Sequence, residues 1–416
     1  MRITQTARLM LLSGVATAVM MGQASALEAQ AFVDRIAEVY KPLGYEFSFG
    51  EATLDGDTIT VDGGTVTVVS TPDDPAETVT FDTEITFEGV VENADGSYTA
   101  ESVTIPDIDT EFSTDPAGHL TLSDIRVEGF YLPAGDPVPA IGLLQLFESF
   151  TTGPLTMTRD GEPFFSFESI DSVSVFNPSF ASTDLTDLTS TFLINGIKAD
   201  LSAVSEEDPE AGETIEALGL TSLEGDVHFA MAWSMADGHM TISEFLLDFA
   251  NVGALNIKLD ITGFTPAMLD QIYAMQAAMG SSTEPTEEQE QAQMMQGMAL
   301  MQGVSIISAS VRYDDASLAG KMLDYFAEQS GEDRASFVEG LKATLPAMLE
   351  GSGIPALNAL VVPPVSAFLD NPQSIELKVA PPSPTSLLVL MAAAANPAGL
   401  ITALGLAIEA NTAAAD

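Results

Sequence analysis

The chain has 416 residues, 46% of them hydrophobic, and no cysteine, so disulfides, thiol chemistry and cysteine-based metal sites are excluded. Acidic residues outnumber basic residues by 61 to 13, which gives a formal net charge of −48. Nucleic acids and anionic lipid surfaces are recognised through clustered Lys and Arg, so neither is an expected partner. The acids are spread along the chain, which is typical of a solvated coat; a surface that attracts cations or basic proteins is the alternative.

The first 26 residues have the three parts of a secretory signal. Arg2 and Arg8 precede an apolar run from Leu9 to Met21, and Ala24-Ser25-Ala26 matches an A-x-A cleavage site. The run is shorter than the ~20 residues that span a bilayer. We therefore expect cleavage after Ala26 and export to the periplasm, with an uncleaved membrane anchor as the alternative.

Residues 27–264 are predicted to form a short helix followed by an antiparallel β-meander. Apolar residues have helical spacing between Leu27 and Tyr40, and from residue 58 onward Thr or acid alternates with Val, Ile or Phe, as in strands buried on one face. Asp-Gly pairs are a hairpin signal. They occur at Asp55, Asp62, Asp95, Asp160 and Asp237. Strands that begin at Gly96, Gly118 and Gly238 share a Gly-x-x-Thr pattern, a weak internal repeat.

A short helix is expected over Val138–Phe150, where Ile141, Leu144 and Phe147 share one side. The best-formed run of strands is Leu223–Trp233, Met240–Phe249 and Ala254–Gly263. The predicted fold class is therefore mainly β with α (α+β). It is a long curved antiparallel meander sheet with a helical, Met-rich C-terminal part.

Residues 265–416 are predicted to be helix-rich, with returning strands, and to pack on the sheet. Thr265-Pro266 and a capping box from Thr286 to Gln289 start two helices. Strands are expected over 304–313 and 374–380, helices over 318–327 and 336–349, and breaks at Pro355, Pro363 and Pro364. The segment Ser386–Ile408 has no charged residue. It is interpreted as two short helices and a last strand, with a membrane span as the alternative.

Seven methionines are concentrated in these two capped helices. Six are candidates for an apolar ligand surface and Met295 lies among them: Met268, Met275, Met279, Met294, Met298 and Met301. Methionine packs against irregular shapes, so the helices are predicted to receive a hydrophobic ligand or partner, ordinary core packing being the alternative.

No motif of catalysis, metal binding or cofactor binding is present in the sequence. His119, His228 and His239 lack the spacing of metal ligands. Asp55-Gly56-Asp57 and Asp107-Ile108-Asp109 do not continue into a 12-residue calcium loop, which leaves only weak, incidental calcium binding. We expect no enzymatic activity and no cofactor.

Several short motifs punctuate the mature chain. They are Gly44-Tyr45, Ala52-Thr53-Leu54-Asp55-Gly56-Asp57-Thr58-Ile59-Thr60-Val61, Asn371-Pro372, Pro381-Pro382-Ser383-Pro384 and Asn396-Pro397. With the signal and the short helix, this arrangement resembles exported alphaproteobacterial proteins of unknown function over most of the chain. The Gly-x-x-Thr strands of residues 45–263 are similar to those of periplasmic AsmA-like and YdgA-like proteins. That likeness implies long curved sheets, an envelope role and, for AsmA-like proteins, lipid movement, but supplies no site residue.

Three functions fit the sequence. The leading hypothesis is a non-enzymatic periplasmic envelope protein that binds a lipid, another hydrophobic ligand or an envelope partner. A structural or assembly factor of the envelope is the second, and a carboxylate-based hydrolase is the third.

The export hypothesis predicts a mature protein that is released by osmotic shock and begins at Leu27. N-terminal sequencing of the released fraction measures both properties. Recovery only from detergent-solubilised membranes, with residues 1–26 retained, would contradict it.

Overall fold

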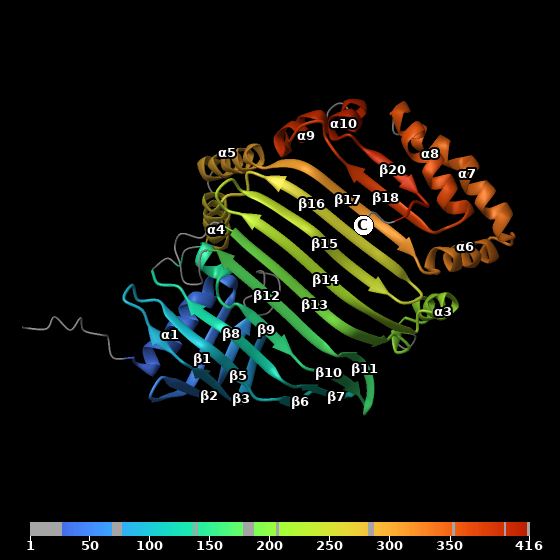
Figure 1. Cartoon of the computed structure of the whole chain (residues 1–416). Coiled ribbons are helices and arrows are strands. Elements are labelled where there is room, and N and C mark those ends of the chain that lie inside the picture. The colour runs from blue at the N-terminus through green and yellow to red at the C-terminus, as the bar shows by residue number, and fades with distance from the viewer. Residues whose placement is uncertain are drawn as a thin grey trace, which may run out of the picture.

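The computed structural model describes residues 27–68, 77–135, 138, 140–177, 187–204, 208–281, 287–351, 354–394 and 397–413. The predicted signal, Thr286 of the expected capping box and Asn396 of the Asn396-Pro397 pair therefore lie outside the described residues. The described chain forms one long antiparallel sheet with helices at its ends and sides (Figure 1). This confirms the predicted α+β class and the meander.

The N-terminal strands are β1 (Tyr45–Asp55), β2 (Thr58–Val68), β3 (Glu77–Glu88), β4 (Val91–Glu92), β5 (Tyr98–Ile105), β6 (Ile108–Thr114), β7 (Ala117–Leu122), β8 (Ile125–Leu132), β9 (Ser149–Thr152), β10 (Leu155–Arg159), β11 (Glu162–Phe167) and β12 (Ser169–Asn177). The later strands are β13 (Asp187–Asp200), β14 (Ser222–Ser234), β15 (His239–Phe249), β16 (Gly253–Thr262), β17 (Ser305–Asp315), β18 (Ser374–Val379), β19 (Thr385–Ser386) and β20 (Ala407–Ala410).

Strands pair with their neighbours along the chain. The order is β1–β2–β3–β5–β8–β9–β12–β13–β14–β15–β16–β17–β18–β20, and every pairing is antiparallel. The short strands β6, β7, β10 and β11 extend this ladder at one side, and β11 also pairs with β13. One sheet therefore runs through both predicted parts of the chain, because β16 pairs with β17 across the predicted boundary.

The helices are α1 (Ala29–Tyr40), η1 (Lys41–Leu43), η2 (Ala140–Leu144), α3 (Pro209–Leu218), α4 (Pro266–Ser281), α5 (Glu287–Gly303), α6 (Leu318–Gln329), α7 (Arg334–Glu350), α8 (Pro355–Asp370), α9 (Leu387–Ala394) and α10 (Pro397–Leu404). The uncharged C-terminal segment is thus two short helices followed by a strand, as predicted. In the described part of the chain, none of the helices has the length and hydropathy needed to cross a membrane.

Two predictions about helices are wrong. The expected helix over Val138–Phe150 is only one 3₁₀ turn, because Ser149 and Phe150 are drawn into β9 by pairing with β8 and β12. Pro363 and Pro364 do not break the chain but lie inside α8. The helix contacts α7, β18 and β20, and such tertiary packing can override the unfavourable helix propensity of proline.

Four of the five Asp-Gly pairs form tight turns, as predicted. They join β1 to β2, β4 to β5, β10 to β11 and β14 to β15. The fifth prediction is wrong: Asp62-Gly63 lies within β2, where Gly63 has a positive φ and the register to β3 shifts. The same dipeptide that closes a hairpin also suits a β-bulge, since both need a left-handed residue.

The largest core forms where the N-terminal strands curve around α1. Phe32, Val33 and Val39 of that helix are at most 1% exposed and pack on one face of β2, β3, β5 and β8. Phe32 makes edge-to-face contacts with Phe87 and Tyr98. Residues near η2 complete this core. The amphipathic helix predicted from its spacing is therefore the element on which the first strands fold.

A recurring glycine motif interrupts the regular strand conformation at three places. In each copy a glycine with φ near +65° follows Glu or Asn, and a Glu-Ser pair on the neighbouring strand lies against it. The copies are Glu88-Gly89 with Glu101-Ser102, Glu128-Gly129 with Glu148-Ser149, and Asn195-Gly196 with Glu168-Ser169. The serine hydroxyl bonds to the side chain before the glycine in all three, at 2.9, 3.4 and 3.0 Å. At Gly196 the register between β13 and β14 also shifts, as in a β-bulge, which increases strand twist.

The motif predicts that Gly129→Ala destabilises the protein by about 1–3 kcal/mol, because a left-handed conformation strains residues other than glycine. The added Cβ would also lie 2.6 Å from Glu148 Cγ. Urea denaturation measures the free energy of unfolding.

Gly297→Ala is the matched control, since this glycine lies in α5 and an added Cβ meets nothing within 4 Å. It should leave stability unchanged or raise it by about 0.5–1 kcal/mol. Equal effects of the two substitutions would show that the glycine motif does not constrain the fold.

Candidate functional site: the apolar face of the sheet

From β13 to β18 the two faces of the sheet differ sharply in composition. Side chains alternate between faces along a strand, and the register identifies which residues share one. One face, here called the apolar face, carries only aliphatic and aromatic side chains across its centre. It is formed by Phe192, Ile194, Val227, Phe229, Phe245, Leu247, Leu255, Ile257, Leu259, Val311, Ile375 and Leu377.

The apolar face is incompletely covered. Ten of these side chains are half-buried, while Val311 is 41% and Leu377 is 40% exposed. These two lie opposite each other on β17 and β18. The most extensive contacts of β14, β15 and β16 are those with the strands on either side of them. A monomer seldom leaves a contiguous apolar surface of this kind open unless it binds something.

Helices frame this face at its margins. At one end Trp233, which is 2% exposed, packs with Phe264 and Leu269, and its indole N–H donates to the Phe264 carbonyl at 2.7 Å. α4, α5 and α9 gather at this end, while α3 and α6 lie at the opposite end and contact each other (Figure 1). The α1 core covers the N-terminal strands. The middle of the sheet thus remains the open part.

The opposite face, here called the polar face, is tied together by charged pairs. Arg312 is 8% exposed and donates two hydrogen bonds to Asp314, at 2.7 and 2.6 Å, and one to the Thr412 carbonyl. Bonding to Asp314 raises the Arg312 pKa. Lys378 bridges to Glu409 at 2.7 Å, which raises the Lys378 pKa. These bonds hold β17, β18 and the last strand β20 in register, so the polar face has a structural role.

The predicted methionine surface is divided by the structure. Met268 is buried, with its Cε close to Gly303, and therefore joins α4 to the end of α5. Met275 and Met301 are half-buried, and the side chain of Met279 lies outside the described residues. Met294, Met295 and Met298 are exposed on α5. No ligand contact tests these residues, so their role stays a prediction.

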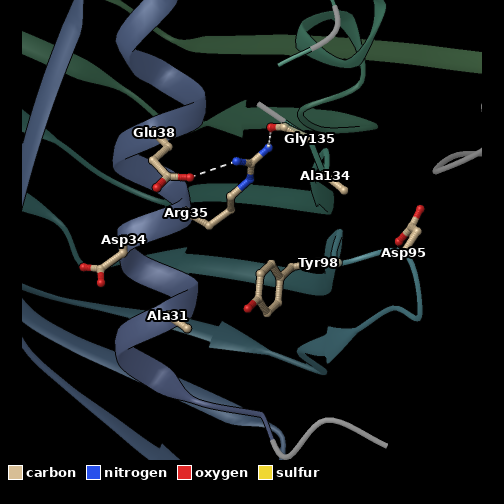
Figure 2. A pocket seen from close by; sticks show the side chains of 9 residues that line it. Ala31, Asp34, Arg35, Glu38, Asp95, Tyr98, Ala134 and Gly135 are labelled. Carbon is tan, nitrogen blue, oxygen red and sulfur yellow. Dashed lines mark hydrogen bonds and ion pairs between the residues drawn. The ribbon is translucent and has the colours of Figure 1, made fainter. Parts of the chain in front are cut away.

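A polar pocket lies between α1 and the strands behind it (Figure 2). Arg35 reaches across it: its Nε donates to the Pro133 carbonyl at 2.8 Å, its Nη2 to the Gly135 carbonyl at 2.8 Å, and its Nη1 to Glu38 at 2.8 Å. Burial raises the pKa of Tyr98 in the same pocket. The N–H groups of the guanidinium already donate to backbone carbonyls and to Glu38. Arg35 therefore fastens α1 to the sheet, and the pocket is a poor anion site.

Two of the three candidate histidines, and acids of the second candidate calcium motif, have structural partners. His119 bonds to Asp109 at 2.6 Å and His239 to Asp260 at 2.7 Å, each pair joining adjacent strands. Asp107 accepts from the Asp124 N–H. Among the described residues, no group of three or more His, Asp or Glu is arranged to hold a metal ion.

Sequence reasoning missed the apolar face. The alternating strands were recognised one by one, but their register was needed to show that six successive strands, β13 to β18, turn apolar residues to one side. A usable signal was the shortage of amphipathic helices between residues 187 and 262, where strand follows strand with only α3 between.

A protein-family model described as "Uncharacterized protein" matches residues 246–411, less than half of the chain. The match begins within β15 and ends just after β20, so it includes α4 to α10 and the C-terminal half of the apolar face. No curated protein matches the sequence.

If the Figure 2 pocket is a fastening point, Arg35→Ala should destabilise the protein by about 1.5–3 kcal/mol, because hydrogen bonds to a charged group are lost. Denaturant unfolding measures the change. Lys41→Ala, which removes an exposed contact of 4.0 Å to Glu46, serves as the control and should change stability by less than about 0.5 kcal/mol. Unchanged stability in the Arg35 variant would exclude the fastening role.

Proposed function

We propose that this protein is a non-enzymatic envelope protein of the periplasm that binds a lipid or another hydrophobic ligand on its apolar face. The observation that carries the proposal is the partly exposed apolar surface from β13 to β18. The polar face forms the opposite side of the same strands. A ligand that covers this surface removes apolar area from water, which stabilises the complex by roughly 25 cal/mol per Å².

The shape of the surface favours a long apolar ligand. Apolar positions lie next to one another across the strands, for example Val227, Leu247 and Leu255, or Ile257, Val311 and Leu377. Each methylene group that leaves water contributes about 0.8 kcal/mol. An acyl or isoprenoid chain therefore gains affinity with every strand that it crosses.

Electrostatics favours a neutral or zwitterionic ligand. The net charge of −48 opposes the approach of an anionic lipid. On the apolar face itself the central residues are uncharged, so no basic group is available there to pair with a phosphate. The ligand is accordingly recognised by its hydrocarbon part.

Three acids of the described chain have surroundings typical of structural residues. Hydrogen bonds from the Ser97 backbone and hydroxyl lower the pKa of Asp95, and similar turn or cap bonds lower that of Asp237 and Asp333. A general acid needs the opposite shift, a raised carboxyl pKa. These carboxylates stabilise turns and helix starts.

The proposal predicts that Val311→Asn with Leu377→Asn weakens uptake of an uncharged naphthylamine dye by about tenfold or more, since two apolar contacts with the ligand are replaced by polar groups. Both side chains are more than a third exposed, so the fold should tolerate the change. Dye fluorescence during titration measures the affinity.

Val173→Asn with Val175→Asn is the matched control. These residues are 43% and 60% exposed but lie on the other side of the sheet, since Val173 pairs with Thr191 and that residue with Ala230. This variant should bind the dye as the wild type does. If the wild type takes up no dye, or both variants lose it equally, the ligand-binding proposal fails and a structural role in the envelope takes its place.

A further inference from the structure

A second apolar surface lies on the helices at one end of the sheet. It consists of Met294, Met295 and Met298 on α5, which are 66%, 62% and 41% exposed, and Val389 and Met391 on α9, which are 53% and 57% exposed. The two helices contact each other. We call these five residues the α5–α9 patch. Exposed large apolar side chains in a group mark an interaction site more often than scattered ones do.

The patch lies next to the end of the apolar face. α5 ends at Gly303, directly before β17, and α9 begins at Leu387, directly after β19. β19 pairs with Ser305 and Ile306, and the Leu387 N–H donates to the Val304 carbonyl at 3.1 Å. Both helices therefore leave the sheet at the same corner, as Figure 1 shows. A molecule bound on the apolar face needs to move only along β17 to reach them.

On the α9 side the surroundings of the patch are uncharged, whereas α5 carries Glu287, Glu288 and Glu290 in its first turn. The segment Ser386–Ile408, which includes α9 and α10, has no charged residue, although 18% of the whole chain is charged. α9 and α10 have eight residues each. Such helices are too short to span a bilayer, which needs about 20 residues, but exposed apolar side chains such as Val389 and Met391 can enter the interface.

The lack of basic residues near the patch and the acids elsewhere indicate the kind of membrane. Binding to anionic lipids relies on clustered Lys and Arg, and the described residues of α5, α9 and α10 include neither. The acidic remainder of the chain is repelled by an anionic surface. A zwitterionic surface imposes no such repulsion and accepts apolar side chains between its head groups.

We propose that the α5–α9 patch docks this protein on a zwitterionic lipid surface. Docking sets the corner of β17 and β19 against the membrane and places the end of the apolar face beside it. In that position a hydrophobic molecule passes between bilayer and sheet without exposure to water. This role rests on the proposed function, whereas docking itself does not.

Vesicle flotation tests the proposal. The whole chain is floated with phosphatidylcholine vesicles. Wild type and variants are prepared alike, so that any effect of residues 1–26 is common to all. Met294→Gln with Met391→Gln should lower the fraction bound by about tenfold or more, because two apolar side chains no longer enter the interface. Glutamine keeps the length and charge of the residue it replaces.

Met348→Gln is the matched control, because Met348 is 73% exposed but lies on α7. It should bind vesicles as the wild type does. Phosphatidylglycerol vesicles should bind the wild type more weakly than phosphatidylcholine vesicles at low salt.

Three results would overturn the docking proposal. They are wild-type protein that fails to float with phosphatidylcholine, equal loss in the Met348 control, and a dimer in light scattering that the patch variant dissociates, which would make the patch an interface between copies. Failure of the proposed function looks different: dye uptake on the apolar face is then absent while vesicle binding persists. Conversely, patch variants that float normally but take up dye leave the ligand-binding proposal standing and refute docking alone.

Discussion

The structure depends on one constraint: strands pair almost entirely with their neighbours along the chain, so a single sheet grows without folding back on itself. A sheet of this kind has two faces and must cover or use the apolar one. At the N-terminal end α1 covers it and forms a dry core around Phe32. From β13 onward no second sheet is available, and helices reach only the margins, so the apolar face stays partly open. Its exposure is thus a consequence of the topology.

The opposite face explains how such a sheet stays in register. Arg312, Asp314 and Glu376 form one linked group across β17 and β18, and Lys378 extends it to β20. Bonds of this type join strands directly and do not need a packed layer above them. The polar side chains therefore stabilise the sheet where the hydrophobic core does not, which leaves the apolar residues free to contact a ligand.

Much of the fold was predictable because the signals are local. Asp-Gly pairs located four hairpins, and helical spacing located α1, α4, α6 and α7. The failures share a cause: a local pattern has more than one solution until tertiary pairing selects one. Asp62-Gly63 became a bulge, Phe150 joined a strand, and Pro363 and Pro364 remained helical within α8. The recurring Glu-Gly and Glu-Ser pairs were overlooked because their partners lie 12 or more residues apart in sequence and meet only across strands.

The apolar face is a property of register, so no single stretch of sequence could reveal it, whereas the predicted methionine helices turned out to lie at its end. The most direct test of its role is to place a photoreactive benzoylphenylalanine at position 229, on the apolar face, and at position 230, on the polar face, and to identify by mass spectrometry what each captures in the native envelope. Lipid or another long apolar molecule captured from position 229 and not from position 230 is the result expected here. Capture of nothing from either position, or of the same molecules from both, would contradict a ligand-binding apolar face.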